Sequence, residues 1–169
     1  GASQTVNLSG IPFNPTFTCL NYKEKISHAV VAEYKTIKTL TATNFSNARM
    51  TVTPLSITDS SFVRVEHNFA KPDSFHHFAI PYRLSPNHYW TVDGLFTNGF
   101  KAKAIISYDG RTAAFSGNEW LDNNLITAAE DSIVLLYRRN AADEWHLYPY
   151  YTKTMGTNHN DKIGSITID

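Results

Sequence analysis

The stretch RLSPNHYWTVDG, at residues 83–94, gathers the side chains that a catalytic or carbohydrate-binding site would use. It holds basic, acidic, hydroxyl and imidazole groups beside a tyrosine and a tryptophan. Such polar groups can transfer protons, and aromatic rings offer an apolar face with a polar tip to a ligand. The alternative is that these side chains belong to an ordinary loop that enters a β-strand.

The backbone that this stretch predicts is a turn followed by a strand. Proline presets φ at the second position of Ser85-Pro86-Asn87, and asparagine tolerates the tight backbone there. From there to Gly94, side chains alternate between two faces. One row contains His88, Trp90 and Val92, and we expect Trp90 and Val92 to point into the core. The second row, Tyr89, Thr91 and Asp93, is expected to face solvent or a neighbouring domain, with Arg83 at its start.

A second aromatic row occurs in EWHLYPYY, at residues 144–151. Trp145 alternates with Leu147, which indicates a core-facing row. The opposite row contains His146, Tyr148 and Tyr150, and it is of functional interest if it is exposed. The predicted ligand or partner surface therefore consists of Arg83, Tyr89, Asp93, His146, Tyr148 and Tyr150.

Catalytic signatures are absent from the sequence. It has no HExxH zinc motif, and the adjacent His76 and His77 would face opposite sides of a strand. It also lacks G-x-S-x-G and the glycine-rich loops that bind nucleotides. His67 and His146 each lie in an alternating strand, where a lone histidine is usually structural. We predict no catalytic residues, no metal ligands and no cofactor.

Acidic and amide clusters are the remaining candidates for chemistry. Glu119 with Asp122, and Glu130 with Asp131, could act as carboxylate pairs in a glycosidase, but solvated loop acids are the favoured interpretation. Asn158, Asn160 and Asp161 are rich in oxygen ligands, as is Asp122-Asn123-Asn124. Neither cluster matches a calcium loop, so we expect turns and leave calcium binding open.

Strand periodicity dominates the chain. Residues 100–108 alternate, as do residues 60–69, where Val63, Val65, His67 and Phe69 share a face. Asp109-Gly110 predicts a tight turn with positive φ, followed by a returning strand at 111–115. Residues 132–138 are apolar on both faces and predict a central, doubly covered strand. Further strands are expected at 28–37, at 48–53 with Pro54 ending the ladder or lying at an edge, at 144–151 and at 162–168. Residues 119–130 fit a helix or a loop with a short strand.

This pattern predicts an all-β protein, an antiparallel β-sandwich of immunoglobulin-like or jelly-roll type. We expect one domain over residues 1–169. The alternative is two small sandwiches, at about 1–82 and 83–169, joined by a linker rich in proline and histidine.

Composition narrows the function classes. Fifteen basic residues balance fifteen acidic ones, so there is no excess charge for nucleic acid. Aromatic residues make up 13% and charged residues 18%, which suits a secreted or cell-surface domain. The single cysteine, Cys19, excludes an internal disulfide and is expected to be buried. No apolar run is long enough to span a membrane, and both ends suggest a piece of a longer protein.

Several segments resemble a known family: VRVEHNFAKPD (63–73), YRLSPNHYWTVDGLF (82–96), SYDGR (107–111), DSIVLLYRRNAADEWHLYPYYTKT (131–154) and KIGSITID (162–169). They are similar to the β-rich region that follows the catalytic part of secreted bacterial proteins of the M1 family of zinc aminopeptidases. That family's HExxH and GxMEN-like motifs do not occur here. The resemblance therefore implies an accessory domain without catalytic residues and a secreted parent.

Three hypotheses follow, from different classes of function. The first is a non-catalytic accessory or interaction β-sandwich of a larger secreted, peptidase-like protein, whose partners are the parent's other domains. The second is a carbohydrate-binding module with an aromatic surface, and peptide is a further ligand that such a surface could take. The third is a stand-alone hydrolase, which a pocket holding at least two of His67, His76, His146, Glu119 and Asp122 would favour.

Overall fold

The structure is a computed structural model, and it describes residues 29–76, 81–112 and 121–169. The expectations for Cys19, His77, Glu119 and the strand beyond Thr112 lie outside these residues. The described residues form β-strands and no helix, and every strand pair is antiparallel. None of them forms a helix that is long and apolar enough to cross a membrane.

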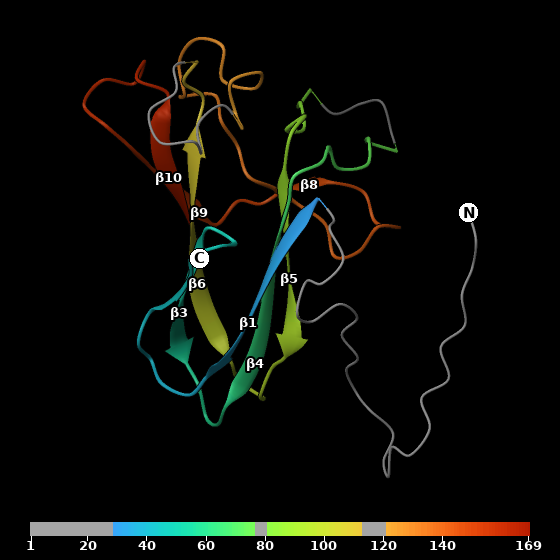
Figure 1. The fold of residues 1–169 in the computed structure, drawn as a ribbon, viewed down its shortest axis with the longest axis vertical. Helices are drawn as coiled ribbons and strands as arrows, with labels where there is room; N and C mark the ends of the chain where they lie inside the picture. The colour runs from blue at the N-terminus through green and yellow to red at the C-terminus, as the bar shows by residue number, and fades with distance from the viewer. Residues whose placement is uncertain (1–28, 77–80, 113–120) are drawn as a thin grey trace.

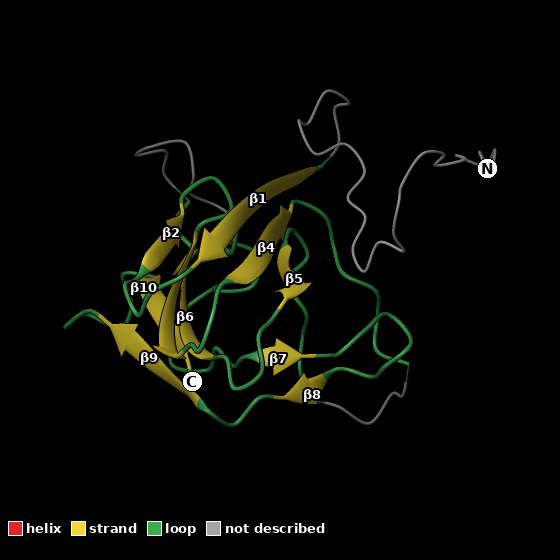
Figure 2. Cartoon of the chain, turned by 90° about the horizontal axis from the view of Figure 1, so that it is seen from below, coloured by secondary structure: helices red, strands yellow, loops and turns green. Residues whose placement is uncertain are grey.

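The described residues form two larger sheets and a small ribbon (Figures 1 and 2). The first sheet has the order β1 (Val30–Ile37), β4 (Ser61–Asn68), β5 (Tyr89–Leu95). The second has the order β2 (Thr43–Phe45), β3 (Met50–Ser56), β6 (Lys101–Asp109), β10 (Ile163–Ile168), β9 (Tyr151–Met155). The ribbon pairs β7 (Leu136–Tyr137) with β8 (His146–Leu147).

The core lies between the two larger sheets because their strands alternate as the sequence predicts. On β4, Val63 and Val65 are buried, while Arg64 and Glu66 form an ion pair on the other face. Buried side chains from both sheets make one cluster, which includes Ile37, Phe45, Met50, Val52, Val63, Val65, Ile106 and Ile166. Burying each such aliphatic side chain contributes about 1.5–3 kcal/mol. The all-β antiparallel prediction is confirmed, and the packing is consistent with a β-sandwich. The choice between immunoglobulin-like and jelly-roll topology stays a prediction.

Both sheets combine strands from before and after residue 82. β4 pairs with β5, and β3 pairs with β6. A boundary at residue 82 would therefore separate hydrogen-bonded neighbours in each sheet. The extent of a single domain over residues 1–169 stays a prediction, because the first 28 residues lie outside the described part.

Pro54 does not end its ladder. It is buried within β3 and opposes Ala102 of β6, and the register shifts between Pro54 and Ser56. On the other side of β3, the pairing with β2 reaches only Val52. Pro54 thus lies at a local edge, where its missing N–H leaves no ladder bond unmade.

Three local expectations are wrong. Residues 132–138 contribute only Leu136–Tyr137 to a strand, so they are not a central strand. Gly110 is not among the described glycines with positive φ; close packing explains it instead, because a Cβ there would lie 2.7 Å from Cβ of Ile126. Residues 121–130 form a loop of turns, which excludes the helix, and the short strand expected in that loop is absent from the described residues. At Gly110 and in residues 121–130, contacts with residues distant in the sequence determine the backbone conformation. The local sequence pattern does not indicate such contacts.

Candidate functional site

The predicted surface residues fall into separate groups. Tyr89 and Asp93 lie on β5, in the first sheet. His146 begins β8, and Tyr148 and Tyr150 follow it. Arg83 lies before β5, where its guanidinium donates to the carbonyl of Leu125 at 3.0 Å. The six predicted residues therefore belong to different parts of the fold.

The β5 row is largely engaged with its neighbour β4. The carboxylate of Asp93 lies 3.1 Å from Nε of Arg64 and forms an ion pair with it. Thr91 accepts a hydrogen bond from the amide of Asn68 at 3.3 Å. Because the row already has partners within the sheet, it offers few groups to a ligand.

Trp90 and Val92 differ in position. Trp90 packs against the core, as expected, and its indole N–H donates to the carbonyl of Ala48 at 2.8 Å. Val92 opposes the buried Val65 across the β4–β5 pair and so shares its face, but it is 48% exposed, so it is not buried in the core as expected. It lies on β5, the edge strand, where no further strand of the sheet covers it among the described residues.

The second aromatic row forms a continuous group of rings, which we call the aromatic ladder: Tyr137, His146, Tyr148 and Tyr150. Centroids are 6.1 Å apart for Tyr137 and His146, 5.3 Å for Tyr137 and Tyr148, and 5.9 Å for Tyr148 and Tyr150. Tyr150 is 68% exposed and Tyr137 is 40% exposed. The hydroxyl of Tyr148 donates to the carbonyl of Asp169. Tyr137 was not among the predicted surface residues. It belongs to the ladder because it pairs with His146 across the ribbon.

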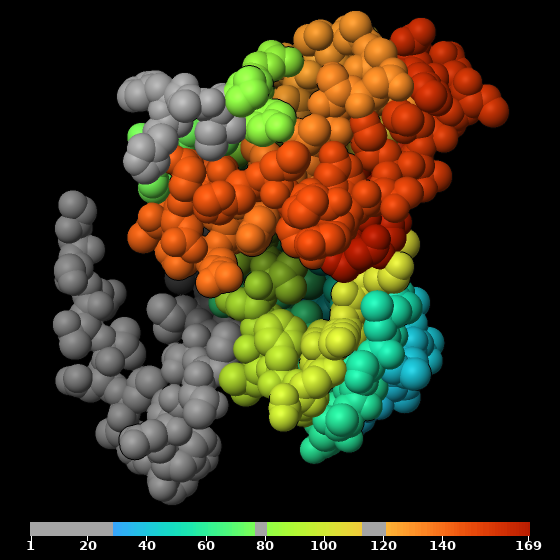
Figure 3. All heavy atoms as spheres, turned by 180° about the vertical axis from the view of Figure 1, so that it is seen from behind, coloured from blue at the N-terminus to red at the C-terminus, as the bar shows by residue number. Residues whose placement is uncertain are grey.

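The row opposite the ladder is only partly buried. Trp145 is buried, as predicted. Its indole N–H donates to the carbonyl of Asp73, and the Arg138 guanidinium lies over its ring. Leu147 was expected beside it in the core, but it is 44% exposed. In Figure 3, the orange and red segments after residue 121, which include this ribbon, form a continuous part of the surface.

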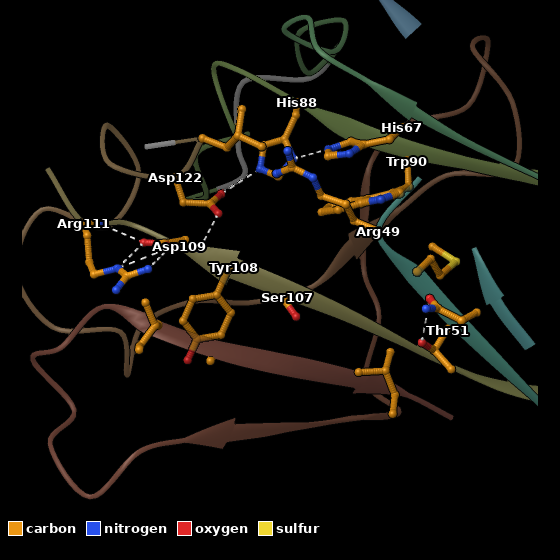
Figure 4. A pocket seen from close by; sticks show the side chains of 16 residues that line it. Arg49, Thr51, His67, His88, Trp90, Ser107, Tyr108, Asp109, Arg111 and Asp122 are labelled. Carbon is orange, nitrogen blue, oxygen red and sulfur yellow. Dashed lines mark hydrogen bonds and ion pairs between the residues drawn. The ribbon is translucent and has the colours of Figure 1, made fainter. Parts of the chain in front are cut away.

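A buried network joins three side chains that the sequence did not bring together. Nε2 of His67 lies 2.8 Å from Nδ1 of His88, and Nε2 of His88 lies 2.8 Å from Oδ1 of Asp122 (Figure 4). The second oxygen of Asp122 accepts the backbone N–H of Asp109 at 2.9 Å. His67 comes from β4, His88 from the turn before β5, and Asp122 from the loop after β6. The carboxylate accepts a hydrogen bond from His88 and so fixes the orientation of that ring.

The network lines a cavity of about 500 Å³, which we call the histidine cavity (Figure 4). Its wall also includes Arg49, Trp90 and Arg111. Arg49 ends a turn that Glu33 holds by accepting the backbone N–H groups of residues 47 and 48 at 2.6 and 3.1 Å. The Arg111 guanidinium forms a two-oxygen ion pair with Asp109, which neutralises both charges.

The surroundings of His67 keep it neutral. The side chain is fully buried, and its ring stacks on Trp90 at 4.5 Å and lies 4.3 Å from Phe69. Desolvation, and then the nearby His88 and Arg49, lower the pKa of His67 from 6.5 to about 3. Its Nδ1 has no hydrogen-bond partner among the described residues. His67 is therefore a weak proton acceptor at the end of a well-ordered chain.

Two of the loop acids, Asp122 and Glu130, are not the solvated residues that the sequence suggested. Asp122 is 5% exposed and Glu130 is fully buried, whereas Asp131 is exposed. Neither carboxylate oxygen of Glu130 has a hydrogen-bond partner among the described residues. Burial, and then the charge of Asp161, raise the pKa of Glu130. Burial and the neighbouring Glu130 raise the pKa of Tyr108 to about 12.

The amide-rich loop forms turns. The side chain of Asn158 accepts the backbone N–H of Asn160 at 3.2 Å, and that of Asp161 accepts the backbone N–H of Ile163 at 3.2 Å. These are local turn contacts. Within the described ranges, no group of three or more His, Cys, Asp or Glu side chains is placed to hold a metal ion.

Comparison with known proteins adds no relative to this description. No protein-family model matches the chain, and no match was found among curated proteins or solved structures. The relation to the accessory region of M1-type peptidases therefore stays a prediction from the segments quoted above.

Proposed function

We propose that the chain is a non-catalytic interaction domain of a larger secreted, peptidase-like protein, and that it contacts a protein partner through the aromatic ladder. The exposed ladder carries this proposal. Tyrosines supply large contact area with few rotatable bonds, and they are enriched at the energetic centres of protein interfaces. The exposed Leu147 adds apolar area beside them. The secreted parent rests on the composition and on the resemblance of the segments.

The ring geometry favours a protein partner over a carbohydrate. A sugar-stacking platform offers several ring faces in one plane, so that a flat chain can lie across them. Here the Tyr137 and Tyr148 rings meet at 78°, and the Tyr148 and Tyr150 rings meet at 82°. Edge-to-face rings leave pockets between them, and side chains from another protein fill such pockets.

A hydrolase is the second candidate, because the histidine cavity holds both His67 and Asp122. Two observations rank it lower. A base needs a pKa near the working pH, and that of His67 is lowered to about 3. A nucleophile must also lie within hydrogen-bond reach of its base. Among the described residues, no hydroxyl or thiol side chain forms a hydrogen bond with either imidazole ring.

A displayed peptide library tests the proposal. Peptides are selected on the wild-type chain and then measured on Tyr150→Ala, where we expect affinity to fall about tenfold or more. Phe96→Ala is the matched control: it removes another exposed ring, one that stacks on Phe100 at 5.4 Å, and should leave affinity unchanged.

Two results would replace the proposal. Glycan-array binding that Tyr150→Ala abolishes would make the ladder a carbohydrate site. Turnover of peptide or ester substrates that a folded His88→Ala variant loses would assign the chain a catalytic role at the histidine cavity.

A further inference from the structure

A second cavity, of about 480 Å³, lies apart from the histidine cavity, and the two share no lining residue among those that the structure describes. Its described wall consists of Lys71, Ser74, Phe75, Arg83, Leu84, Pro86, Asn124 and Leu125. We call it the basic cavity, because Lys71 and Arg83 are its charged residues. Arg83 was predicted to belong to the same surface as the aromatic row, but in the structure it lines this cavity, away from the aromatic ladder.

The charge of the basic cavity is unbalanced. Among the described residues, its lining contains Lys71 and Arg83 and no acidic residue. The acids nearest in sequence have other partners: Asp73 pairs with Arg138 at 2.7 Å, and Asp122 is bound to His88 at 2.8 Å. Within the described part of the chain, neither cation forms an ion pair. An anion entering this cavity would meet positive charge that no carboxylate of the described residues neutralises.

Arg83 is oriented before any ligand arrives. One NH2 group donates to the carbonyl of Leu125 at 3.0 Å, which fixes the guanidinium at the wall of the cavity. A guanidinium has five N–H donors in a planar fork, so others remain for a carboxylate. Lys71 is exposed, and a flexible ammonium suits it to follow the charge of the ligand.

The rest of the wall is mostly apolar. Phe75, Leu84, Pro86 and Leu125 are all partly buried, and the polar side chains beside them are Ser74 and Asn124. An inorganic anion would use the two cations and leave this apolar wall without a partner. A ligand with both a carboxylate and an apolar group would satisfy both parts, and the volume suits a ligand of amino-acid size.

We propose that the basic cavity binds an apolar carboxylate, such as the C-terminal residue of a peptide or a small organic acid. Its carboxylate pairs with Arg83 and Lys71, and its apolar group packs on Phe75 and Leu125. This site is separate from the aromatic ladder, and its ligand can be measured without the ladder's partner.

NMR titration of the full chain tests the proposal with N-acetyl-phenylalanine and its uncharged carboxamide. We expect saturable amide shifts in segments 71–75, 83–86 and 124–125 with the acid, and binding about tenfold weaker with the carboxamide. Arg83→Gln and Lys71→Gln should each weaken binding of the acid. Lys101→Gln removes an exposed cation that does not line the cavity, and should not change it.

Further ligands distinguish peptide C-termini from organic acids, and several results would contradict the proposal. Tighter binding of N-acetyl-phenylalanine than of 3-phenylpropionate assigns the cavity to peptide C-termini, and the reverse order assigns it to organic acids. Equal binding of acid and carboxamide, absence of saturable shifts, or equal affinity for inorganic phosphate would overturn the proposal. So would undiminished binding to folded Arg83→Gln and Lys71→Gln variants.

Discussion

His67 and Glu130 are both fully buried, and each resists taking the charge that it would carry in water. For His67 the neutral form is the unprotonated one, and for Glu130 it is the protonated one. Their effects on stability therefore run in opposite directions with pH. This opposition allows each group to be tested by a single substitution.

Protonation of His67 should favour the unfolded chain. The unfolded state binds a proton below its pKa of 6.5, whereas the folded state resists protonation down to about 3. The contribution of His67 to the unfolding free energy should therefore decrease as the pH falls through this window, by at most about 1.4 kcal/mol per pH unit. Urea unfolding of the wild type and His67→Phe between about pH 4 and about pH 8 measures this contribution. We expect a shallower acid slope in His67→Phe. His159→Gln removes an exposed histidine as a control, and identical slopes in wild type and His67→Phe would contradict the account.

Ionisation of Glu130 should favour the unfolded chain. Its folded-state pKa is raised above 4.5, so its contribution to stability is present at low pH and lost as the pH rises through the folded-state pKa. Glu130→Gln mimics the protonated form, and we expect it to be more stable than the wild type at neutral pH and similar near pH 4. Glu66→Gln, which loses an ion pair with Arg64, should change stability by only about 0–1 kcal/mol. A neutral-pH loss of stability in Glu130→Gln would show that the carboxylate is satisfied.

Residue types alone could not identify the buried network. The alternation of residues 60–69 and 88–93 placed His67, His88 and Trp90 on inward rows, which was the available signal. Asp122 gave none, because its burial depends on the loop that folds against the end of β6, where it exchanges backbone and side-chain hydrogen bonds with Asp109. Acids in a polar segment look solvated until such a contact is known.

At the scale of elements, β10 packs tightly between β6 and β9. A Cβ at Gly164 would lie 2.3 Å from the Tyr108 hydroxyl and 2.5 Å from the backbone oxygen of Thr154. The backbone oxygen belongs to a paired strand and has little freedom to move. Gly164 is therefore needed for the close approach of these strands.

Gly164→Ala should destabilise the chain by about 1–3 kcal/mol, because it overpacks this contact. Gly156→Ala is the matched control: the nearest atom there is a side-chain oxygen of Asp161, at 2.9 Å, which can rotate away. Its effect should stay within about 0.5 kcal/mol. Urea unfolding of both variants measures the difference, and equal losses would contradict the packing described here.

Elements with one buried face could be predicted, and elements without one could not. β4, β6 and β10 follow local alternation, since one face of each meets the core. Residues 132–138 are apolar on both sides. This pattern indicates burial but does not indicate strand pairing, and only Leu136–Tyr137 forms a strand. Asp109-Gly110 has the composition of a tight turn, yet Gly110 N–H bonds to the carbonyl of Lys162 instead. A distant partner overrides a turn signal there.

At the scale of the whole molecule, three features lie in separate parts of the fold. The aromatic ladder lies at the β7–β8 ribbon, the histidine network is buried beside the larger sheets, and Arg83 lines the basic cavity. The second aromatic row was predicted as a possible ligand surface, and its side chains do form an exposed group. The Tyr89–Asp93 row is instead engaged with β4. Whether a row is exposed or engaged depends on which strands pair with each other, and the local sequence pattern does not indicate that pairing.

The most direct test of the interaction function is the affinity of one library-selected peptide for the wild type, Tyr150→Ala and Phe96→Ala, measured by calorimetry. Loss of a tyrosine at the energetic centre of an interface should remove about 1.4 kcal/mol or more, which raises the dissociation constant about tenfold or more. We predict that increase for Tyr150→Ala and wild-type affinity for Phe96→Ala. Equal affinity of the wild type and Tyr150→Ala for every selected peptide would contradict the assignment of the aromatic ladder as the partner surface.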